Sequence, residues 1–207
     1  IAESVYGMLL SYTRGIGNAI KDQSLKKWGS RDNIMELQDS TMMIVGAGHI
    51  GIEVAKLAKA FGMKTIGVNR TGQAVEYMDI IVKQSELISY VQEADVVVNI
   101  LPLTKLTTYF FDKIIFSKMK KTAVFINVGR GKSVNTKDLV EALEEGQLAF
   151  AALDVFETEP LPADNPLWER DDVLITPHIS GLLPKFKDRL FAIFEENLRA
   201  YVEGKEL

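Results

Sequence analysis

The sequence has no cysteine and only two histidines among its 207 residues. The absence of cysteine excludes disulfides, thiolate metal ligands and thiol nucleophiles. It also fits a reducing compartment, so we expect a cytoplasmic protein, and we expect no metal site. Any chemistry must therefore come from carboxylates, hydroxyls, cations, the two histidines or a bound cofactor.

Long apolar runs and an excess of one charge are also missing. No apolar run approaches the length of about 18 residues that a membrane-spanning helix needs, so we expect no membrane contact. The 24 basic and 28 acidic residues give a net charge of -4. This balance leaves no broad basic face, which argues against nucleic acid as a partner and favours small molecules.

The N-terminal stretch IAESVYGMLLSYTRGIG is apolar, but it lacks a basic region and carries Glu3. We therefore do not interpret it as a signal peptide. It also lacks an initiating Met, which indicates a processed or excised chain. With 47% hydrophobic residues, the chain can bury one substantial core, and one domain is the expectation.

From residue 41 onward, short β-branched apolar runs alternate with helical patterns. This alternation is typical of βαβ units around a buried parallel sheet, so we predict an α/β fold with about seven strands. The predicted strands are 41–46, 64–68, 80–82, 95–101, 122–128, 149–154 and 173–175. The predicted helices between them are 50–61, 84–93, 110–118 and 136–146.

The clearest helix boundaries lie at 136–146, where Asn135 or Thr136 can cap free N–H groups and Gly146 can end the helix. Two further helices are expected outside the alternating block. Apolar residues recur at helical spacing over 2–20 and again over 185–203.

The motif IVGAGHIG places three glycines between a predicted strand and a predicted helix. Gly46 suits a tight turn, Gly48 allows the backbone to approach a pyrophosphate, and Gly51 allows close helix–strand packing. The helix N-terminus adds free N–H groups and a partial positive charge. The pattern predicts dinucleotide binding, with His49 as a spacer in the loop.

The second predicted strand ends in GVNRTG, where NAD-binding sites usually carry an acidic residue that binds the ribose 2′-hydroxyl. Here Asn69, Arg70 and Thr71 offer neutral donors, a guanidinium and a hydroxyl. These groups suit a 2′-phosphate, so we expect NADP(H). The alternative is NAD(H), bound without its usual carboxylate beside an ordinary loop arginine.

Later strands also end on residues that can carry chemistry. Arg130 lies between two glycines, Asp154 opens an acidic and proline-rich loop, and His178 follows the last strand. Ligands of open α/β sheets bind beyond the carboxyl ends of the strands, so these residues should converge on one crevice. Each has a structural alternative, as a capped strand end, a loop carboxylate or a packed histidine. Their joint occurrence predicts a catalytic site.

The chain resembles the nucleotide-binding domain of the D-isomer-specific 2-hydroxyacid dehydrogenase family, a Rossmann-type doubly wound fold. Five motifs carry the resemblance in the family's order: GAGHIG, NILPLTKLTT, FINVGRG, ALDVFETEP and TPHISG. The resemblance implies that Arg130 binds the substrate's carboxylate and keto groups, that His178 is the acid–base and that Glu159 pairs with it. Related formate dehydrogenases carry Gln in place of Glu159, which argues against formate.

The resemblance further implies that Asp154 binds the nicotinamide carboxamide, that the Val128 backbone and residues 178–181 lie beside the ring, and that the stretch from Leu101 lines the cofactor's side. The predicted cofactor-binding residues are Gly46, Gly48, His49, Ile50, Gly51, Asn69, Arg70, Thr71, Leu101, Pro102, Thr107, Val128, Gly129, Arg130, Asp154, His178 and Gly181.

By the same resemblance, residues 1–207 form an isolated cofactor domain and the substrate domain is absent from the chain. Residues 1–30 then hold a crossing helix and the contact of a two-fold homodimer, and residues 185–207 hold the helix that crosses back. We expect such a domain to bind cofactor with little or no turnover, because the second wall of the cleft is missing.

The favoured function is an NADP(H)-dependent reductase of small 2-keto acids, most like glyoxylate/hydroxypyruvate reductases. One alternative is an NAD-dependent enzyme of the phosphoglycerate dehydrogenase type. Another is a cofactor-sensing protein like the transcriptional corepressors that share this fold, since those relatives retain similar residues.

Overall fold

The computed structural model describes residues 1–29 and 34–205. Position 30 of the predicted N-terminal segment and positions 206–207 of the predicted C-terminal segment lie outside these described residues. Within them, seven parallel strands form one sheet in the order β3-β2-β1-β4-β5-β6-β7, which confirms the predicted doubly wound fold. The strands are β1 (Thr41–Val45), β2 (Lys64–Asn69), β3 (Ile80–Lys83), β4 (Val96–Asn99), β5 (Val124–Asn127), β6 (Phe150–Leu153) and β7 (Val173–Ile175).

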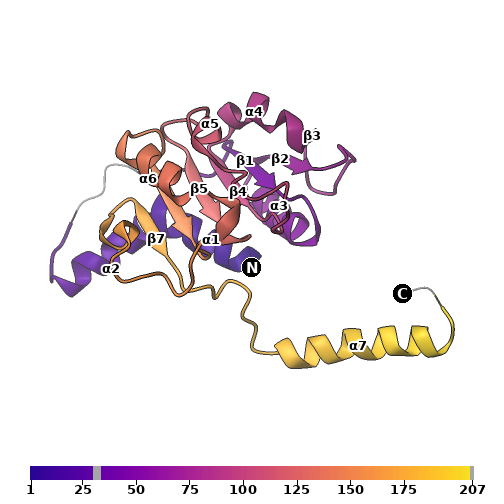
Figure 1. Cartoon of the computed structure of the whole chain (residues 1–207). Coiled ribbons are helices and arrows are strands. Elements are labelled where there is room, and N and C mark those ends of the chain that lie inside the picture. Colours follow the sequence, from indigo (N-terminus) through magenta and orange to yellow (C-terminus); the bar gives the residue numbers. More distant parts are fainter. Residues whose placement is uncertain (30–33, 206–207) are drawn as a thin grey trace.

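Helices cover both faces of the sheet (Figure 1). One core cluster packs α1 and α3 against one face, and a second packs α4, α5 and α6 against the other. The α-helices are α1 (Ala2–Thr13), α2 (Ile16–Ser24), α3 (His49–Ala60), α4 (Leu87–Tyr90), α5 (Lys113–Phe116), α6 (Thr136–Glu144) and α7 (Phe186–Val202), with short 3₁₀ turns at Gln84–Glu86, Val91–Glu93, Gly131–Ser133 and Pro166–Glu169.

The interiors of the central strands are almost wholly apolar because both faces of the sheet are covered. In β1, Met43 and Val45 enter one core while Met42 and Ile44 enter the other. In β5, Phe125 packs with Phe111 and Phe116 at ring-centroid distances of 4.9 and 5.4 Å. Because every strand pair is parallel, the carboxyl ends of all seven strands lie at one edge of the sheet.

The expected boundaries of α6 are confirmed. The Asn135 side chain accepts a hydrogen bond from Asp138 N at 3.2 Å, so Asn135 rather than Thr136 is the cap. Gly146 adopts a φ of 65° just after the helix, the left-handed conformation that commonly ends helices.

Three helix predictions were wrong in their extent. The stretch 2–20 is broken into α1 and α2, because Gly15 adopts a φ of 67° between them. The stretch 84–93 is one short α-helical turn, α4, between two 3₁₀ turns. The stretch 110–118 yields only α5, which begins where Asp112 accepts hydrogen bonds from two backbone amides.

The apolar face of α1 packs on its own domain, so this face is not available for the predicted homodimer contact. Val5 and Leu9 are fully buried. Tyr6 donates from its hydroxyl to Val54 O at 2.9 Å and stacks on Phe61, and burial raises the pKa of Tyr6. The exposed apolar residues of this region lie farther along, in α2 and at Trp28.

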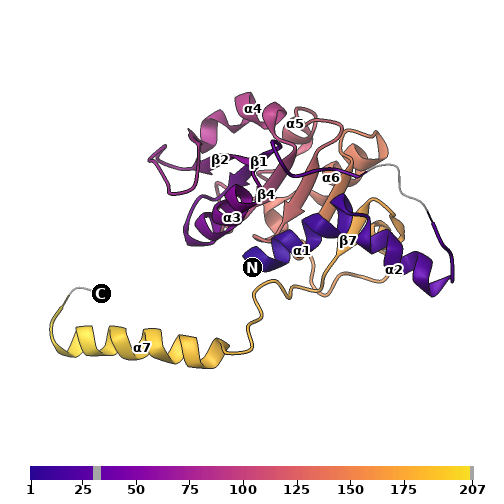
Figure 2. The ribbon, with the colours of Figure 1, turned by 180° about the vertical axis from the view of Figure 1, so that it is seen from behind.

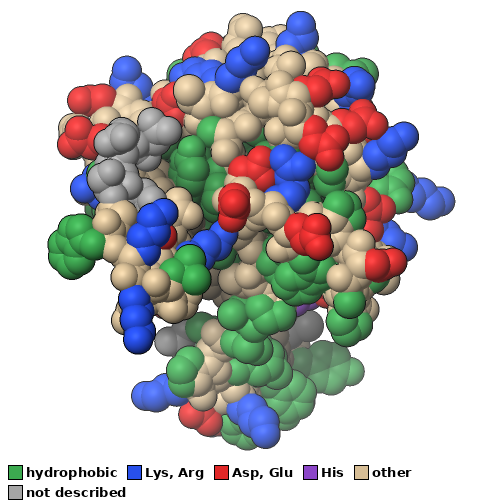
Figure 3. Space-filling model, turned by 90° about the vertical axis from the view of Figure 1, so that its left-hand side faces the viewer, with side chains coloured by type: hydrophobic (Ala, Val, Ile, Leu, Met, Phe, Trp, Pro, Cys, Tyr) green, Lys and Arg blue, Asp and Glu red, His purple; other side chains and the backbone are tan. Residues whose placement is uncertain are grey.

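Helix α7 lies away from the sheet at the end of the segment that follows β7 (Figures 1 and 2). Hydrophobic side chains gather on this lower part of the molecule (Figure 3). They include the predicted stripe Leu190, Ile193, Phe194 and Leu198, all of which are exposed. Of the helices that the structure describes, none is both long enough and apolar enough to cross a membrane.

Candidate cofactor and active site

A cleft of about 740 Å³ opens where β1, β2 and β4 end. The glycine loop forms one wall, and its three glycines differ in surroundings. Gly46 has a φ of 109°, which favours glycine, and a Cβ on Gly51 would lie 2.8 Å from Gly46 O. A Cβ on Gly48 would meet nothing within 4 Å, and no side chain caps the α3 turn that follows it. The loop therefore presents open backbone and a helix N-terminus to the cleft.

Nine predicted cofactor residues line this one cleft. They come from the glycine loop, from the end of β2 and from the segment after β4. The nine are Gly46, Gly48, His49, Ile50, Asn69, Arg70, Leu101, Pro102 and Thr107. Thr107 shapes the last segment, because its hydroxyl donates to Pro102 O at 2.6 Å. Gln84 and Lys105 also line the cleft. Gln84 lies outside the five motifs, and Lys105 lies within NILPLTKLTT but was not among the predicted cofactor-binding residues.

The end of β2 has a defined loop geometry. Asn69 accepts hydrogen bonds from Thr71 N at 3.1 Å and Gly72 N at 2.6 Å, and its Nδ2 donates to Gln73 O at 2.9 Å. Asn69 thus closes a turn, and its role toward a cofactor stays a prediction. Arg70 and Lys105 both line the cleft, so each is a cation near an anion bound there, and the preference for a 2′-phosphate stays a prediction.

His178 and Glu159 form a direct pair. The Nδ1 atom of His178 lies 2.7 Å from Glu159 Oε2, and Glu159 Oε1 accepts from Phe156 N at 2.9 Å. Partial burial raises the pKa of Glu159, but the hydrogen bonds from His178 and Phe156 and the charge of His178 outweigh it, so the pKa lies below its ordinary value. This contact uses Nδ1, and the predicted acid–base role of the other ring nitrogen, Nε2, stays a prediction.

Asp154 holds the turn that carries His178. The carboxylate accepts hydrogen bonds from Thr176 Oγ1, from Ile179 N at 2.9 Å and from Ser180 N at 3.0 Å. The Asp154 carbonyl also accepts from His178 N at 2.9 Å. Asp154 is only 1% exposed, so in this structure its side chain acts as a buried anchor. Its predicted contact with a nicotinamide carboxamide stays a prediction.

Arg130 lies between two close backbone contacts. A Cβ on Gly129 would lie 2.8 Å from Leu101 O, and a Cβ on Gly131 would lie 1.8 Å from Phe156 O. The flanking glycines therefore allow the backbone at Arg130 to pass between Leu101, which we call the cofactor wall, and the loop that leads to Glu159. The Arg130 side chain is exposed, and its Nη1 donates to Gly129 O at 2.7 Å.

Glu157 lies in the same acidic loop as Glu159, and no role was predicted for it from the sequence. Its carboxylate accepts from Tyr109 Oη at 2.9 Å and from Thr136 N at 2.8 Å. Partial burial raises the pKa of Glu157, but these hydrogen bonds and the charge of Lys132 lower it by more. The pKa of Glu157 therefore lies below its ordinary value. Glu157 therefore ties the acidic loop to the start of α6 and leaves Glu159 for the histidine.

A second hollow, of about 400 Å³, adjoins the histidine pair. Its lining combines the pair with apolar side chains: Phe156, Glu159, Pro160, Leu161, Trp168, Pro177 and His178. Gly181 lines the neighbouring surface together with His178. The structure thus brings Glu159 and His178 together, as the sequence predicts. Gly131, next to Arg130, packs against the same loop, and the convergence of the Arg130 side chain with this pair stays a prediction. A buried cluster of Asn99, Asn127 and Ser133 at the Arg130 carbonyl was not predicted.

A seven-stranded parallel sheet with an open glycine loop at the carboxyl ends of its strands defines an α/β domain of the dinucleotide-binding class. The family model for the D-isomer specific 2-hydroxyacid dehydrogenase, NAD binding domain, matches residues 6–180. The chain belongs to this family.

The chain is similar to proteins of this family from several organisms. It is 36% identical to the glyoxylate reductase of Thermofilum pendens over 99% of the chain and 62% of that relative's length. It superposes on a phosphoglycerate dehydrogenase from Lactobacillus plantarum with a TM-score of 0.85 and 40% identity, covering 100% of the chain and 67% of the solved protein.

A third similar protein is solved with a cofactor. It is an NADPH-dependent glyoxylate/hydroxypyruvate reductase from Sinorhizobium meliloti in complex with NADP and sulfate, with a TM-score of 0.88 and 30% identity. The match covers 100% of the chain and 66% of that protein. The chain therefore spans about two thirds of the length of these relatives.

Proposed function

We propose that the chain is the cofactor domain of an NADP(H)-dependent reductase that converts a small 2-keto acid to the 2-hydroxy acid, of the glyoxylate/hydroxypyruvate type. The observation that carries the proposal is the direct pair of His178 and Glu159, together with the close packing of Gly131, next to Arg130, against the loop that leads to Glu159. Family membership supports the reaction class.

The residues fit a bound dinucleotide. The cleft offers open backbone at Gly48 and the uncapped start of α3 for a pyrophosphate, and Arg70 for a 2′-phosphate. When bound, the cofactor supplies the hydride. Leu101 and Pro102 give the cleft an apolar side.

The chain's own residues account for binding and protonation. Arg130 can grip the substrate carboxylate with two parallel hydrogen bonds and polarise the keto oxygen. His178 donates a proton from Nε2 to that oxygen as the keto carbon is reduced. Glu159 holds Nδ1, orients the ring and stabilises the imidazolium before the proton leaves.

The site also needs a second wall. The His178 side chain is 51% exposed, and reduction of a keto acid benefits from a closed, water-poor site. We therefore propose that residues outside this sequence of 207 residues close over the pair of His178 and Glu159. On this view the chain alone binds cofactor and turns over little substrate.

Calorimetric titration with NADPH and NADH tests the cofactor preference. We expect tighter binding of NADPH, and Arg70→Ala should weaken NADPH binding about tenfold or more while changing NADH binding less than about twofold. Lys118→Ala is the matched control, since it removes an exposed cation outside the cleft. Tighter binding of NADH by the unaltered chain would reject the NADP(H) proposal.

The function itself is tested with the complete gene product that contains this chain and a panel of 2-keto acids. Reduction of glyoxylate or hydroxypyruvate with NADPH, lost in His178→Ala, is expected. Oxidation of 3-phosphoglycerate with NAD would favour the phosphoglycerate dehydrogenase alternative. Cofactor binding without hydride transfer to any acid, and no effect of His178→Ala, would favour the cofactor-sensing alternative.

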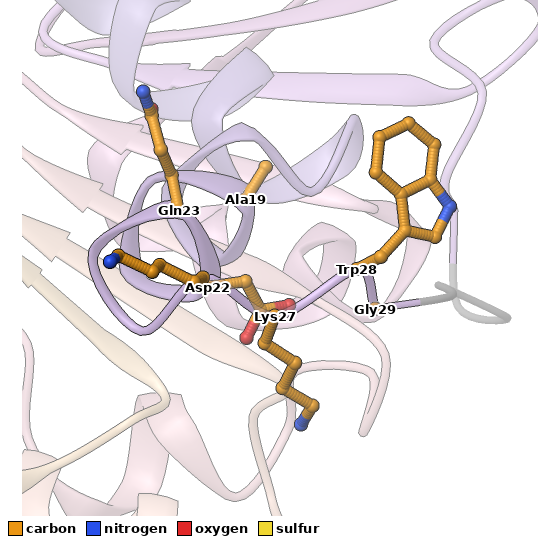
Figure 4. Close-up of a pocket in the computed structure, with 7 residues that line it drawn as sticks. Ala19, Asp22, Gln23, Lys27, Trp28 and Gly29 are labelled. Atoms are coloured by element: carbon orange, nitrogen blue, oxygen red, sulfur yellow. The ribbon is translucent and has the colours of Figure 1, made fainter.

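We also propose that the segment 16–28 forms the contact of a homodimer. Ile16, Ile20, Leu25 and Trp28 are all exposed, and Trp28 points away from α2 beside a hollow of about 480 Å³ (Figure 4). Equilibrium sedimentation should give a dimer that Ile20→Glu converts to a monomer. A monomer of 23.1 kDa at high concentration in the unaltered chain would reject this contact.

A further inference from the structure

Three buried polar side chains lie beneath Arg130. Asn99 ends β4 and Asn127 ends β5, and the two are paired neighbours in the sheet register. Ser133 ends the 3₁₀ turn Gly131–Ser133. The exposed fractions are 0% for Asn99, 1% for Asn127 and 0% for Ser133. Buried polar groups of this kind are costly unless they are hydrogen-bonded.

The three side chains satisfy one another. Asn99 Nδ2 donates to Asn127 Oδ1 at 2.9 Å and to Ser133 Oγ at 2.7 Å. Both hydrogens of the Asn99 amide are thereby used, and the Ser133 hydroxyl is left to donate elsewhere. The cluster bridges two strands and the turn between β5 and α6, which no single hydrogen bond would do.

The remaining bonds of the cluster run to backbone of the proposed site. The Arg130 carbonyl accepts from Ser133 Oγ, from Ser133 N at 3.1 Å and from Asn127 Nδ2 at 3.5 Å. Asn127 Oδ1 accepts from Gly129 N at 3.2 Å, and Asn99 Oδ1 accepts from Leu101 N at 3.1 Å. The same three side chains therefore fix the backbone of Arg130 and of the cofactor wall at Leu101.

We propose that Asn99, Asn127 and Ser133 are positioning residues that set the place of Arg130 relative to the cofactor cleft. The inference rests on the proposed reductase function, in which Arg130 binds the substrate carboxylate. A carboxylate held in two-pronged geometry by Arg130 loses binding when the guanidinium shifts, since such bonds depend steeply on direction. When the hydrogen bonds of the cluster are weakened, substrate binding is therefore expected to weaken more than cofactor binding.

Ser133→Ala removes one donor to the Arg130 carbonyl and one acceptor of Asn99 while leaving both strands intact. In the complete gene product, we expect KM for the 2-keto acid to rise about tenfold, the change expected when a displaced Arg130 loses one of its two hydrogen bonds to the substrate carboxylate, worth about 1.4 kcal/mol. The dissociation constant of NADPH should change less than about twofold. The matched control is Thr13→Val, because the Thr13 hydroxyl is buried without a partner among the described residues.

Two results would overturn the proposal. One is an unchanged KM in Ser133→Ala. The other is a loss of NADPH affinity as large as the rise in KM, because a general loosening of the fold would move both constants together. A selective rise in KM, absent from Thr13→Val, supports it.

Amide hydrogen exchange of the unaltered chain keeps the proposal testable if Ser133→Ala does not fold. The amides of Leu101 and Gly129 should be strongly protected, because buried side-chain acceptors hold them. Exchange at the rate of exposed loop amides would show that the cluster does not fix this backbone, and would overturn the proposal.

Oxamate separates this proposal from the proposed function, since it presents a carboxylate to Arg130 without requiring turnover. If no 2-keto acid is reduced, the reductase function fails. Weaker oxamate binding in Ser133→Ala than in Thr13→Val then still supports positioning of Arg130. Equal oxamate binding in the two variants, or no oxamate binding by the unaltered protein with NADPH, overturns it.

Discussion

The Nδ1 atom of His178 lies 2.7 Å from the Oε2 atom of Glu159. Two different segments make this pair: the loop after β6 presents the carboxylate and the turn after β7 presents the imidazole. The carboxylate is fixed from its other oxygen by Phe156 N, so the ring is held from one side and open on the other.

The pair makes folding stability depend on pH through Glu159. The pKa of this carboxyl is lowered in the folded chain, so its contribution is present above the unfolded carboxyl pKa of about 4.3 and is lost as the pH falls through the folded value. Because the Glu159 and His178 side chains are 35% and 51% exposed, Glu159→Gln should lower the free energy of unfolding by less than about 1 kcal/mol at pH 6.

Urea denaturation at pH 6 and at pH 3.5 measures this difference. The cost of Glu159→Gln should shrink toward zero at the lower pH. Glu53→Gln in the exposed face of α3 serves as the control and should show no such trend. A cost that grows on acidification would contradict the assigned direction of the pKa shift.

Removing the Asp154 carboxylate should be far more damaging than removing an exposed one. Asp154→Ala leaves three donors without an acceptor, and we expect a loss of about 3 kcal/mol in the free energy of unfolding. Asp164→Ala in an exposed loop should stay within about 0.5 kcal/mol. Equal effects of the two variants in chemical denaturation would show that the Asp154 bonds contribute little.

Gly131 cannot accept a side chain without moving the acidic loop. Its Cβ would lie 1.8 Å from a backbone oxygen of Phe156, so Gly131→Ala should cost about 1–3 kcal/mol or more. Gly7→Ala in α1, where a Cβ meets nothing within 4 Å, should instead stabilise the chain by about 0.5–1 kcal/mol. Thermal unfolding of both variants gives the comparison, and a neutral Gly131→Ala would refute the close contact.

Gly48→Ala should separate stability from cofactor binding. The added Cβ has space in the chain itself, so the free energy of unfolding should change by less than about 0.5 kcal/mol. The methyl group would lie where a pyrophosphate approaches the backbone, and we expect NADPH affinity to fall at least about tenfold. Cofactor fluorescence titration measures this, and unchanged affinity would place the phosphates elsewhere.

Much of the fold could be predicted because a two-sided parallel sheet leaves a strong trace in sequence. All seven strands appear near their predicted positions, since each is apolar on both faces and ends in polar or glycine residues. The pairing of Glu159 with His178 was also predicted, as an implication of the resemblance to the family that the five motifs carry.

Other features could not be predicted because they depend on contacts between distant segments. The break at Gly15 is one, since glycine also occurs within helices such as α1, at Gly7. The buried roles of Asn99 and Asn127 are another, because an asparagine at a strand end reads equally well as a turn residue. The exposure of the α7 stripe is a third, since helical spacing shows that a face is apolar and does not name what covers it.

Because Asp154 anchors the turn that bears His178, this turn is already ordered in the chain without a ligand. Its amides are already satisfied from beneath by a carboxylate of the same domain. If a flexible loop became ordered only on binding, the loss of its conformational entropy would lower the affinity for substrate. Here that ordering belongs to folding, so in the proposed reductase the free energy of substrate binding can go toward holding the keto group beside the imidazole.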